Sequence, residues 1–480
     1  MSVKNLLALA VIGASATLVG CGSDSDDAVS NVFVPCDDAA TECTLAGVLQ
    51  EDFTLKTGVE YTLADVFQVG EGNVDLDDAA AVAAAKEAGV TLTIEAGVHV
   101  KAAGEGVLLV TRGSKLEAEG TAAAPITFSG EDDGYDGTGE WGGVVVQGFA
   151  PQYGAGNTGV CGTDVCNVAG EGGDFIGNYG GIDAADNSGT IKYVRIAEAG
   201  KVAGPNNEIN GLTLQGVGHG TTVEYVQVHG NQDDGIEWFG GTVNVKYAVL
   251  TNNDDDAIDF DEGYKGNIQY AIVLQNQAAD ATPVGSNDPR GIEANSSDED
   301  YVPQTEATLA NISVINGPIA AGQPGVRLRG SVNMDFVNSV VASDASNEGC
   351  IRIDDSDHDA DGKLADGSTN PEASAKIDTP VNIINVMASD CGTGTEDGAR
   401  TYPKSSPESE SGLVEVVAAF DTAWALTNGE ATVASTTATA VNNGSNFVFD
   451  ATTYIGAVEP GTAAADAWYA DWIIDGSLDQ

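Results

Sequence analysis

Short alternations of apolar and polar residues recur through most of the chain. Between residues 91 and 100 an apolar side chain occupies every second position, as in a strand with one buried face. Comparable short runs follow at 106–110, 114–121 and 125–128. The one strong helix prediction in the first half is the Ala-rich stretch 77–88. The pattern therefore predicts an all-β fold.

A repeated segment extends this prediction from single strands to an architecture. The sequence VEYVQV at 223–228 returns as VKYAVL at 245–250 and IQYAIV at 268–273, with related copies at 191–196 and 381–386. A period of 22 to 25 residues is typical of one coil of a parallel β-helix, whereas a propeller repeat is about 40 residues or longer. Leucine-rich repeats share the period, but their leucine and asparagine pattern is absent. We predict a right-handed, single-stranded parallel β-helix over 51–400, followed at 401–480 by a final coil and a small cap over the last coil.

Aligning the coils by their apolar residues predicts which side chains point outward. Six apolar pairs come into register, and the residue between each pair should face away from the core. These outward residues are Thr213, Glu237, Asp259, Glu293, Arg327 and Arg352. The preceding turn adds a second row of Asp234, Asp256 and Arg290, beside Asp233 and Asp255. The sequence thus predicts one charged stripe, acidic and then basic along the axis, although a slip of one residue would turn every side chain to the other face.

Several interpretations fit this stripe. It can be a solvated polar face with scattered Ca²⁺, or a binding face for polysaccharide or for an outer-membrane partner such as a nutrient receptor. The binding role, without catalysis, is our prediction. The alternative is a glycoside hydrolase or polysaccharide lyase that acts on acidic glycans, because paired carboxylates can cleave glycosidic bonds. Its candidate catalytic residues are Asp233, Asp234, Glu237, Asp259, Glu293 and Arg327.

One short motif bears on the enzyme interpretation. The sequence NQDD at 231–234 resembles a segment of polygalacturonase-type glycosidases. That family also carries Asn-Thr-Asp one coil earlier, and Gly-His-Gly and Arg-Ile-Lys later. Here the preceding coil has NNEIN at 206–210, and GHG at 218–220 comes before the aspartates. The resemblance is therefore incomplete and out of order.

The charge of the chain favours cations as ligands. It has 73 Asp and Glu against 19 Lys and Arg, a formal charge of -54, which opposes binding to nucleic acid or to anionic membrane surfaces. The stretch 357–364 has the D-x-D-x-D-G spacing of a calcium loop, with Ser368 where a bidentate glutamate belongs. A flexible acidic loop is the alternative. We predict a structural Ca²⁺ site whose ligands are Asp357, Asp359, Asp361 and Asp366.

The N-terminus and the cysteines indicate export. Residues 1–20 combine Lys4 with a short apolar run, typical of a signal peptide, and end before Cys21 in a pattern that resembles a lipobox. An ordinary signal peptide is the alternative. We expect lipidation at Cys21, attachment to the outer membrane of a Gram-negative bacterium through the lipid alone, and an acidic tether with a disulfide segment at 21–50. An even number of remaining cysteines predicts disulfides Cys36–Cys43, Cys161–Cys166 and Cys350–Cys391.

Several motifs together resemble a known group of proteins. They are LTIEAGV at 92–98, GTAAAPITF at 120–128, EWGGV at 140–144, PRGIEA at 289–294, VRLRG at 326–330 and YIGA at 454–457, with Trp468 and Trp472 after it. They resemble a large group of exported bacterial β-helix lipoproteins that has no established activity. The resemblance covers roughly 50–475 and implies the fold and export, but no substrate.

Overall fold

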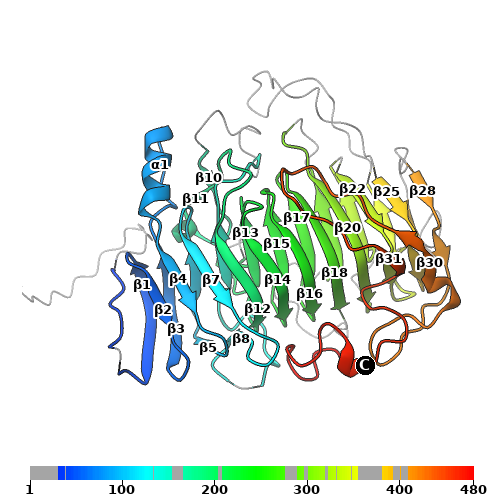
Figure 1. Ribbon diagram of the computed structural model, residues 1–480, viewed down its shortest axis with the longest axis horizontal. Coiled ribbons are helices and arrows are strands. Elements are labelled where there is room, and N and C mark those ends of the chain that lie inside the picture. Colours follow the sequence, from blue (N-terminus) through cyan, green and yellow to red (C-terminus); the bar gives the residue numbers. More distant parts are fainter. Residues whose placement is uncertain are drawn as a thin grey trace, which may run out of the picture.

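The computed structural model has the predicted right-handed parallel β-helix. It describes residues 31–479 except 38, 133, 154–165, 204–207, 276–288, 297–300, 319–322, 331, 348, 355–380, 393–399 and 402–408. Figure 1 shows the coils side by side from β1 (blue) to β28 (orange), with α1 projecting at the N-terminal end. Among the described residues, no helix is both long and apolar enough to span a membrane.

Parallel strands stack into three faces along the axis. The first face contains β2 (Phe53–Leu55), β4 (Thr91–Ile94), β7 (Lys115–Glu119), β22 (Asn333–Val337), β25 (Val381–Ile384) and β28 (Ser409–Ser411). The second contains β5 (His99–Ala102), β8 (Ile126–Ser129), β23 (Val340–Ala342), β26 (Met387–Ser389) and β29 (Val414–Glu415). Both faces are continued by the two halves of β12 (Gly189–Ala197), β14 (Thr222–His229), β16 (Asn244–Thr251), β18 (Lys265–Gln275) and β20 (Glu306–Asn316).

The third face carries the charged residues. Its strands are β6 (Val107–Val110), β9 (Val144–Gln147), β13 (Leu212–Gln215), β15 (Ile236–Phe239), β17 (Ile258–Asp261), β19 (Ile292–Asn295), β21 (Val326–Arg329), β24 (Ile351–Ile353) and β27 (Arg400–Thr401). The second halves of β1 (Glu42–Leu49) and β3 (Glu60–Val69) begin this face. The parallel sheet therefore starts at Glu42, earlier than the boundary expected at residue 51.

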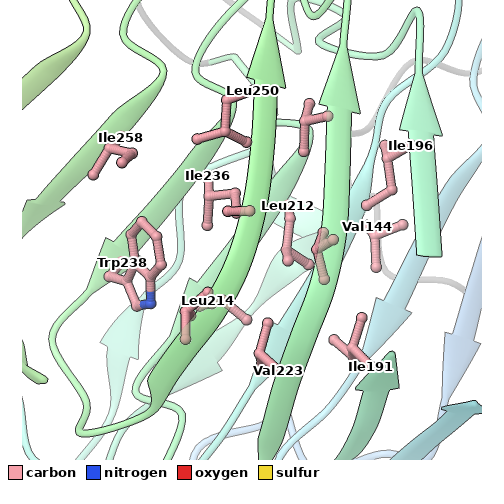
Figure 2. Close-up of a cluster of buried hydrophobic side chains, with 14 of the residues drawn as sticks. Val144, Ile191, Ile196, Leu212, Leu214, Val223, Ile236, Trp238, Leu250 and Ile258 are labelled. Carbon is pink, nitrogen blue, oxygen red and sulfur yellow. The ribbon is translucent and has the colours of Figure 1, made fainter. Parts of the chain in front are cut away.

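The core is a continuous stack of apolar side chains inside the coils. Leu212, Ile236 and Ile258 lie in register on β13, β15 and β17, and all are almost fully buried. Figure 2 shows these residues with Trp238 and the facing residues Ile191 and Val223 of the long strands. Each coil thus buries its apolar residues on the coils above and below, which makes the repeated alternation a signal of the solenoid.

The repeated tyrosines mark the bend between the first two faces. Tyr193, Tyr225, Tyr247 and Tyr270 all have positive φ, from 50° to 65°, which is uncommon for a bulky residue. Their rings stack at centroid distances of 4.4, 4.4 and 5.0 Å. Later coils place asparagine at the bend, at Asn311, Asn338 and Asn385. The stacked rings offset the backbone strain where a tyrosine stands.

Replacing Tyr247 separates the stabilisation by ring stacking from the cost of the positive-φ backbone. Tyr247→Ala should destabilise the protein by about 1.5–2.5 kcal/mol, since it removes a half-buried stacked ring and keeps the strained backbone. Tyr247→Asn loses the same ring, but asparagine tolerates positive φ, so its loss should be smaller by about 0.5–1 kcal/mol. Urea unfolding of both variants measures the difference. Equal losses would contradict the assignment of strain to this bend.

The C-terminal region is more than a cap on the last coil. Residues 416–479, here named the C-terminal strap, run back along the bend and reach the middle of the solenoid. Ile474 N donates to Gln227 Oε1 at 2.7 Å, and Trp472 packs edge-on against Tyr193 and Tyr225. The strap includes β30 (Thr432–Thr436), β31 (Thr452–Tyr454) and the short 3-10 helices η3 (Gly429–Ala431) and η4 (Ala464–Asp466). The apolar groups that it covers are spread over several coils, which a short cap could not reach.

The predicted helix is present as α1 (Ala79–Ala88). Asp78 caps its N-terminus by accepting a hydrogen bond from Ala81 N at 2.8 Å. The described residues between β9 and β12 form three further short elements: β10 (Val168–Ala169), η1 (Asp174–Ile176) and β11 (Asn178–Tyr179). The antiparallel pair β10–β11 interrupts the coil pattern and contributes to the candidate site.

Candidate functional site

The third face has the register that the apolar pairs predict. Thr213 pairs with Glu237, Glu237 with Asp259, and Asp259 with Glu293. Glu293 then pairs with Arg327, and Arg327 with Arg352. Neighbouring strands lie about 4.8 Å apart, so these charged side chains form one row parallel to the axis.

The turn before each strand forms the second predicted row. Asp234 Oδ1 accepts a hydrogen bond from Asp256 N at 2.9 Å, and Asp256 Oδ1 accepts one from Arg290 N at 3.1 Å. Each aspartate therefore also holds the backbone of the next turn. This contact fixes the side-chain row to the same register as the strands.

The acidic part of the two rows lines a cavity of about 400 Å³, here named the acidic basin. Its lining residues are Glu171, Glu208, Asp233, Asp234, Glu237, Asp255, Asp256, Asp259, Glu293 and Arg329. Nine of these ten residues carry carboxyl groups. Glu237, Glu293 and Asp256 are only 8, 6 and 2% exposed, so this part of the stripe is not the open, solvated face considered above.

The β10–β11 hairpin closes one side of the basin and brings Glu171 to it. Gln215 Nε2 donates to the Glu171 carbonyl at 3.2 Å, and Gln147 Nε2 donates to the Ile176 carbonyl at 3.0 Å. Ile176 is fully buried against Val145 and Ile209 of the solenoid. The hairpin is therefore anchored to the coils, and Glu171 faces the row of carboxyls on a fixed support.

Four charged residues of the site were not among the predicted ones. Asp261 and Arg329 lie two residues after Asp259 and Arg327, so they form a further outward row on the same strands. The same alternation could have identified both of them. Glu208 belongs to the turn before β13, and Glu171 comes from the inserted hairpin. No repeat in the sequence signals either glutamate.

At its basic end the stripe becomes a network of ion pairs. We name Arg290, Arg327, Arg329 and Arg352 the arginine cluster. Arg290 Nη1 lies 2.8 Å from Glu293 Oε2 and 3.2 Å from Asp256 Oδ2. The other Glu293 oxygen is 2.8 Å from Arg329 Nε and 3.6 Å from Arg327 Nη1.

Asp354 completes this network at the outer edge. It contacts Arg327 Nε at 2.8 Å and also pairs with Arg352 Nε. The predicted change from acidic to basic along the axis is therefore present. Its outer arginines remain partly exposed, whereas Arg290 is buried among its partners.

Burial shifts the carboxyl groups of the basin toward their neutral forms. The pKa values of Asp233, Asp234, Glu237, Asp256, Asp259 and Asp261 lie well above the usual range, first because the groups are desolvated. Neighbouring carboxylates raise these pKa values further, while Arg290 opposes the shift at Asp256 and Asp259. Burial also raises the pKa of Glu171 to about 7. The basin carboxyl groups therefore need bound protons or nearby positive charge to offset their negative charge.

One carboxyl oxygen in the basin, Asp259 Oδ1, is buried and has no hydrogen-bond partner within the described part of the chain. Asp233, which also lines the basin, is 9% exposed. Buried charged groups are normally paired or bound to metals. The ligand atoms of three triads lie within 4.8 Å of one another: Asp233/Asp234/Asp255, Asp234/Glu237/Asp259 and Asp256/Asp259/Glu293. A set of hard carboxylate oxygens fits a divalent cation such as Ca²⁺.

Other predicted sites lie partly outside the described residues. Cys36–Cys43 and Cys350–Cys391 form disulfides as predicted, whereas Cys161 is not described. The calcium loop with Asp357, Asp359, Asp361 and Asp366 also falls outside the described residues, as does Cys21 with the signal segment. The Cys161–Cys166 disulfide, the calcium loop and lipidation at Cys21 therefore stay predictions.

The glycosidase-like segment 231–234 contributes to the basin through its aspartates. Asn231 is buried, and its Nδ2 donates to the Asp234 carbonyl at 2.7 Å, which shapes the turn. Asp233 and Asp234 line the basin together with Glu237. The cavity and its shifted carboxyl groups are compatible with acid–base chemistry as well as with cation binding.

Comparison with known proteins identifies the family of this chain. A comparison with curated proteins finds no match to this chain. A family model described as a pectate-lyase like beta helix domain matches residues 47–473. The match begins within β1 and covers the remaining coils and the acidic basin, in agreement with the observed fold. The chain therefore belongs to the pectate-lyase like beta helix family.

Proposed function

We propose that this protein binds a polysaccharide at the acidic basin with the help of divalent cations. The observation that carries the proposal is Asp259 Oδ1, a buried carboxyl oxygen with no hydrogen-bond partner among the described residues, in a cavity where three carboxylate triads meet. Carboxylates that are packed together and buried repel one another strongly. A bound cation would remove this repulsion and offer open coordination positions to a ligand.

The residues that would hold the cations come from adjacent coils. Asp233, Asp234 and Glu237 belong to one coil, and Asp255, Asp256 and Asp259 to the next. The solenoid supports them on strands and short turns, which keeps their oxygens in place without a ligand. Glu171 adds a carboxylate from the hairpin side. Ca²⁺ is the best candidate, because it accepts six to eight oxygen ligands in flexible geometry.

Polysaccharide is the ligand class that best suits this arrangement. The rows of the third face continue over several coils, from Glu237 through Glu293 to Arg352, and so present a long, linear polar surface. Cations in the basin could be coordinated by hydroxyl or carboxylate oxygens of a sugar chain lying along these rows. An outer-membrane protein partner, the other class considered, would need an apolar contact area that this charged face does not offer.

Calcium titration of two variants tests the cation site. Asp233→Asn and Asp259→Asn each remove one anionic ligand and preserve the shape of the side chain, so each should weaken Ca²⁺ binding by about ten-fold or more. Isothermal titration calorimetry measures the affinity, and binding of polysaccharides with and without chelator measures the function. Glu119→Asn, at an exposed position outside the basin, serves as the charge-matched control. Calcium affinity that is unchanged in both basin variants would refute the proposal.

Cleavage of acidic polysaccharide is a second candidate function. The specific observation in its favour is that carboxyl groups with raised pKa values lie in one cavity beside Arg329. A raised pKa allows a carboxyl group to act as a general acid or base near neutral pH. A hydrolase would release reducing ends, and a lyase would release products with an unsaturated sugar that absorb in the ultraviolet. If a panel of acidic glycans yields neither product, cleavage is excluded for those glycans and binding remains as the proposed function.

We also propose that the protein is anchored to the outer membrane through a lipid on Cys21. The supports are the apolar run before Cys21, the polar tether after it, and Gly22 at the next position. The wild-type protein should incorporate labelled fatty acid, and the Cys21→Ala variant should not. Equal labelling of both proteins would exclude Cys21 as the lipidated residue.

A further inference from the structure

We infer that Arg112, which lies outside the charged rows, is a positioning residue for the acidic basin. It locks the base of the β10–β11 hairpin and thereby fixes where the carboxylate of Glu171 lies. The inference rests on the proposed function for the role of Glu171 as a cation ligand. It adds that an arginine outside the lining of the basin determines how tightly the cations bind there.

The first observation is the burial of this arginine. Arg112 lies shortly after β6, in the turn of an early coil, and is only 1% exposed. Burial lowers its pKa to about 10, so the guanidinium keeps its charge at neutral pH. Its central carbon lies 5.4 Å from the centre of the Phe149 ring, a distance typical of a cation–π contact. An arginine is rarely buried this completely, so its N–H groups need partners inside the protein.

The second observation is that Arg112 ties the two legs of the hairpin together at their base. Its Nη1 donates hydrogen bonds to the carbonyls of Cys166 and Gly180, at 2.7 and 3.1 Å. Both hairpin strands lie between these two residues, and Glu171 lies in the loop that joins the strands. Nη2 also donates to Asn167 Oδ1 at 3.3 Å. The guanidinium therefore closes the hairpin at the end that lies away from the loop.

The third observation is a second route from Arg112 to the hairpin, through a neighbouring segment. Nε and Nη2 donate to the carbonyls of Gly72 and Val74, at 2.8 and 2.7 Å. Asn73, between these two residues, donates from Nδ2 to the Ile176 carbonyl at 3.2 Å. Arg112 therefore holds a segment that in turn holds the loop of the hairpin.

These contacts require a guanidinium. They use all five N–H donors of Arg112, and every acceptor is a neutral oxygen. Lysine has the same charge, but its three donors share one atom, so it cannot reach the acceptors on both legs and on the neighbouring segment. Buried carbonyls that lose their donors are costly. The base of the hairpin should therefore open in Arg112→Lys.

An open base would change the position of Glu171. At the loop, Gln215 Nε2 donates to the Glu171 carbonyl at 3.2 Å, and Gln147 Nε2 donates to the Ile176 carbonyl at 3.0 Å. These contacts hold the backbone of the loop and not the carboxylate. The other carboxyl groups of the basin repel the Glu171 carboxylate. A hairpin without its lock would therefore let this carboxylate move away from the cations.

A double-mutant cycle on calcium affinity tests the coupling. Arg112→Lys and Glu171→Gln should each weaken Ca²⁺ binding by about ten-fold in titration calorimetry. If Arg112 acts through Glu171, the double variant should bind no more weakly than Glu171→Gln alone. Arg195→Lys is the matched control and should bind like the wild type, because Arg195 donates to Thr127 Oγ1 on another face. Unchanged affinity in Arg112→Lys, or losses that add in the double variant, overturns the inference.

A milder change covers the case in which Arg112→Lys does not fold. Asn73→Ala leaves the guanidinium in place and interrupts the route through the neighbouring segment. It should weaken Ca²⁺ binding several-fold, and this loss should also disappear in the background of Glu171→Gln. Calcium affinity that stays at the wild-type value in Asn73→Ala would then overturn the inference.

Hydrogen exchange without calcium separates the inference from the proposed function. In Arg112→Lys, hairpin amides such as Gly170 N, which donates to the Gly177 carbonyl at 2.8 Å, should exchange about ten-fold faster. Amides of β16 and β18 should keep their wild-type rates. Equal acceleration in both places indicates a general loss of stability and overturns the inference. If the wild type binds no calcium, the proposed function fails, and unchanged exchange in the hairpin would overturn the positioning role as well.

Discussion

Arg290→Gln should lower the free energy of unfolding by about 3–5 kcal/mol, the largest effect of any single change in the charged rows. Arg290 is buried between Asp256 and Glu293, and it also donates to Gln323 Oε1 at 2.9 Å. Removing the guanidinium takes away the ion pair of the buried Asp256 and leaves Glu293 with only the partly exposed Arg327 and Arg329. The cost arises mainly from the buried negative charge that is no longer compensated and not from the lost attraction itself.

Urea unfolding at neutral pH without divalent cations measures this loss. Arg352→Gln is the matched control, because its ion pair with Asp354 is partly exposed and should contribute no more than about 1 kcal/mol. The loss at Arg290 should shrink in acid, where Asp256, whose pKa is raised by burial, takes up a proton. A loss below about 1 kcal/mol at neutral pH would contradict the structural role given to this ion pair.

The second large effect is an unusual pH dependence of stability in the cation-free protein. The basin carboxyls have folded pKa values above their unfolded values, so the native state binds protons more tightly than the unfolded state. This stabilisation is complete below about pH 4, the ordinary carboxyl pKa, and is lost as the pH rises through the folded values. Glu171, with a pKa of about 7, places part of the loss near neutrality. Stability should therefore fall from pH 4 to beyond pH 7.

Calcium should reverse this loss at neutral pH. An ion bound only to the native state adds about 2.7 kcal/mol per site when it is present at one hundred times its dissociation constant. Urea midpoints at pH 4.5, 6 and 7.5, in chelator and in excess Ca²⁺ at equal ionic strength, measure both effects. The Ca²⁺ effect should be large at pH 7.5 and small at pH 4.5, where protons occupy the same oxygens.

Two controls assign these effects to the basin. Glu237→Gln/Asp259→Asn should flatten the pH profile, whereas Glu119→Gln, at an exposed position, should not. Asp359→Asn/Asp361→Asn removes any contribution of the predicted calcium loop. Stability that rises steadily with pH in chelator, or an equal Ca²⁺ effect in the basin variant, would contradict the account.

Much of the fold could be predicted because a solenoid repeats its local contacts. The alternation that places Leu212, Ile236 and Ile258 inside is visible in the sequence, and the same pairs stack in the structure. Since side chains alternate with a period of two, an apolar pair also determines which residue lies outside. The row from Glu237 to Arg352 could therefore be predicted residue by residue.

The surroundings of that row could not be predicted in the same way. Glu171 approaches the row on a hairpin that has no counterpart in other coils, and its position depends on the packing of Ile176 against Val145 and Ile209. These contacts join residues far apart in the sequence without a repeated spacing. The same holds for the C-terminal strap, which reaches Gln227 from Ile474.

The sequence by itself determined the β-helix, its register, and the order of acidic and basic side chains on one face. Those features follow from a short repeat in which each coil contacts its two neighbours in the same way. Only the tertiary structure decided that the acidic half is a buried basin and that the basic half stays partly exposed. Burial depends on what an inserted hairpin covers, and it is burial that raises the pKa of Asp259 and leaves its Oδ1 without a hydrogen-bond partner among the described residues.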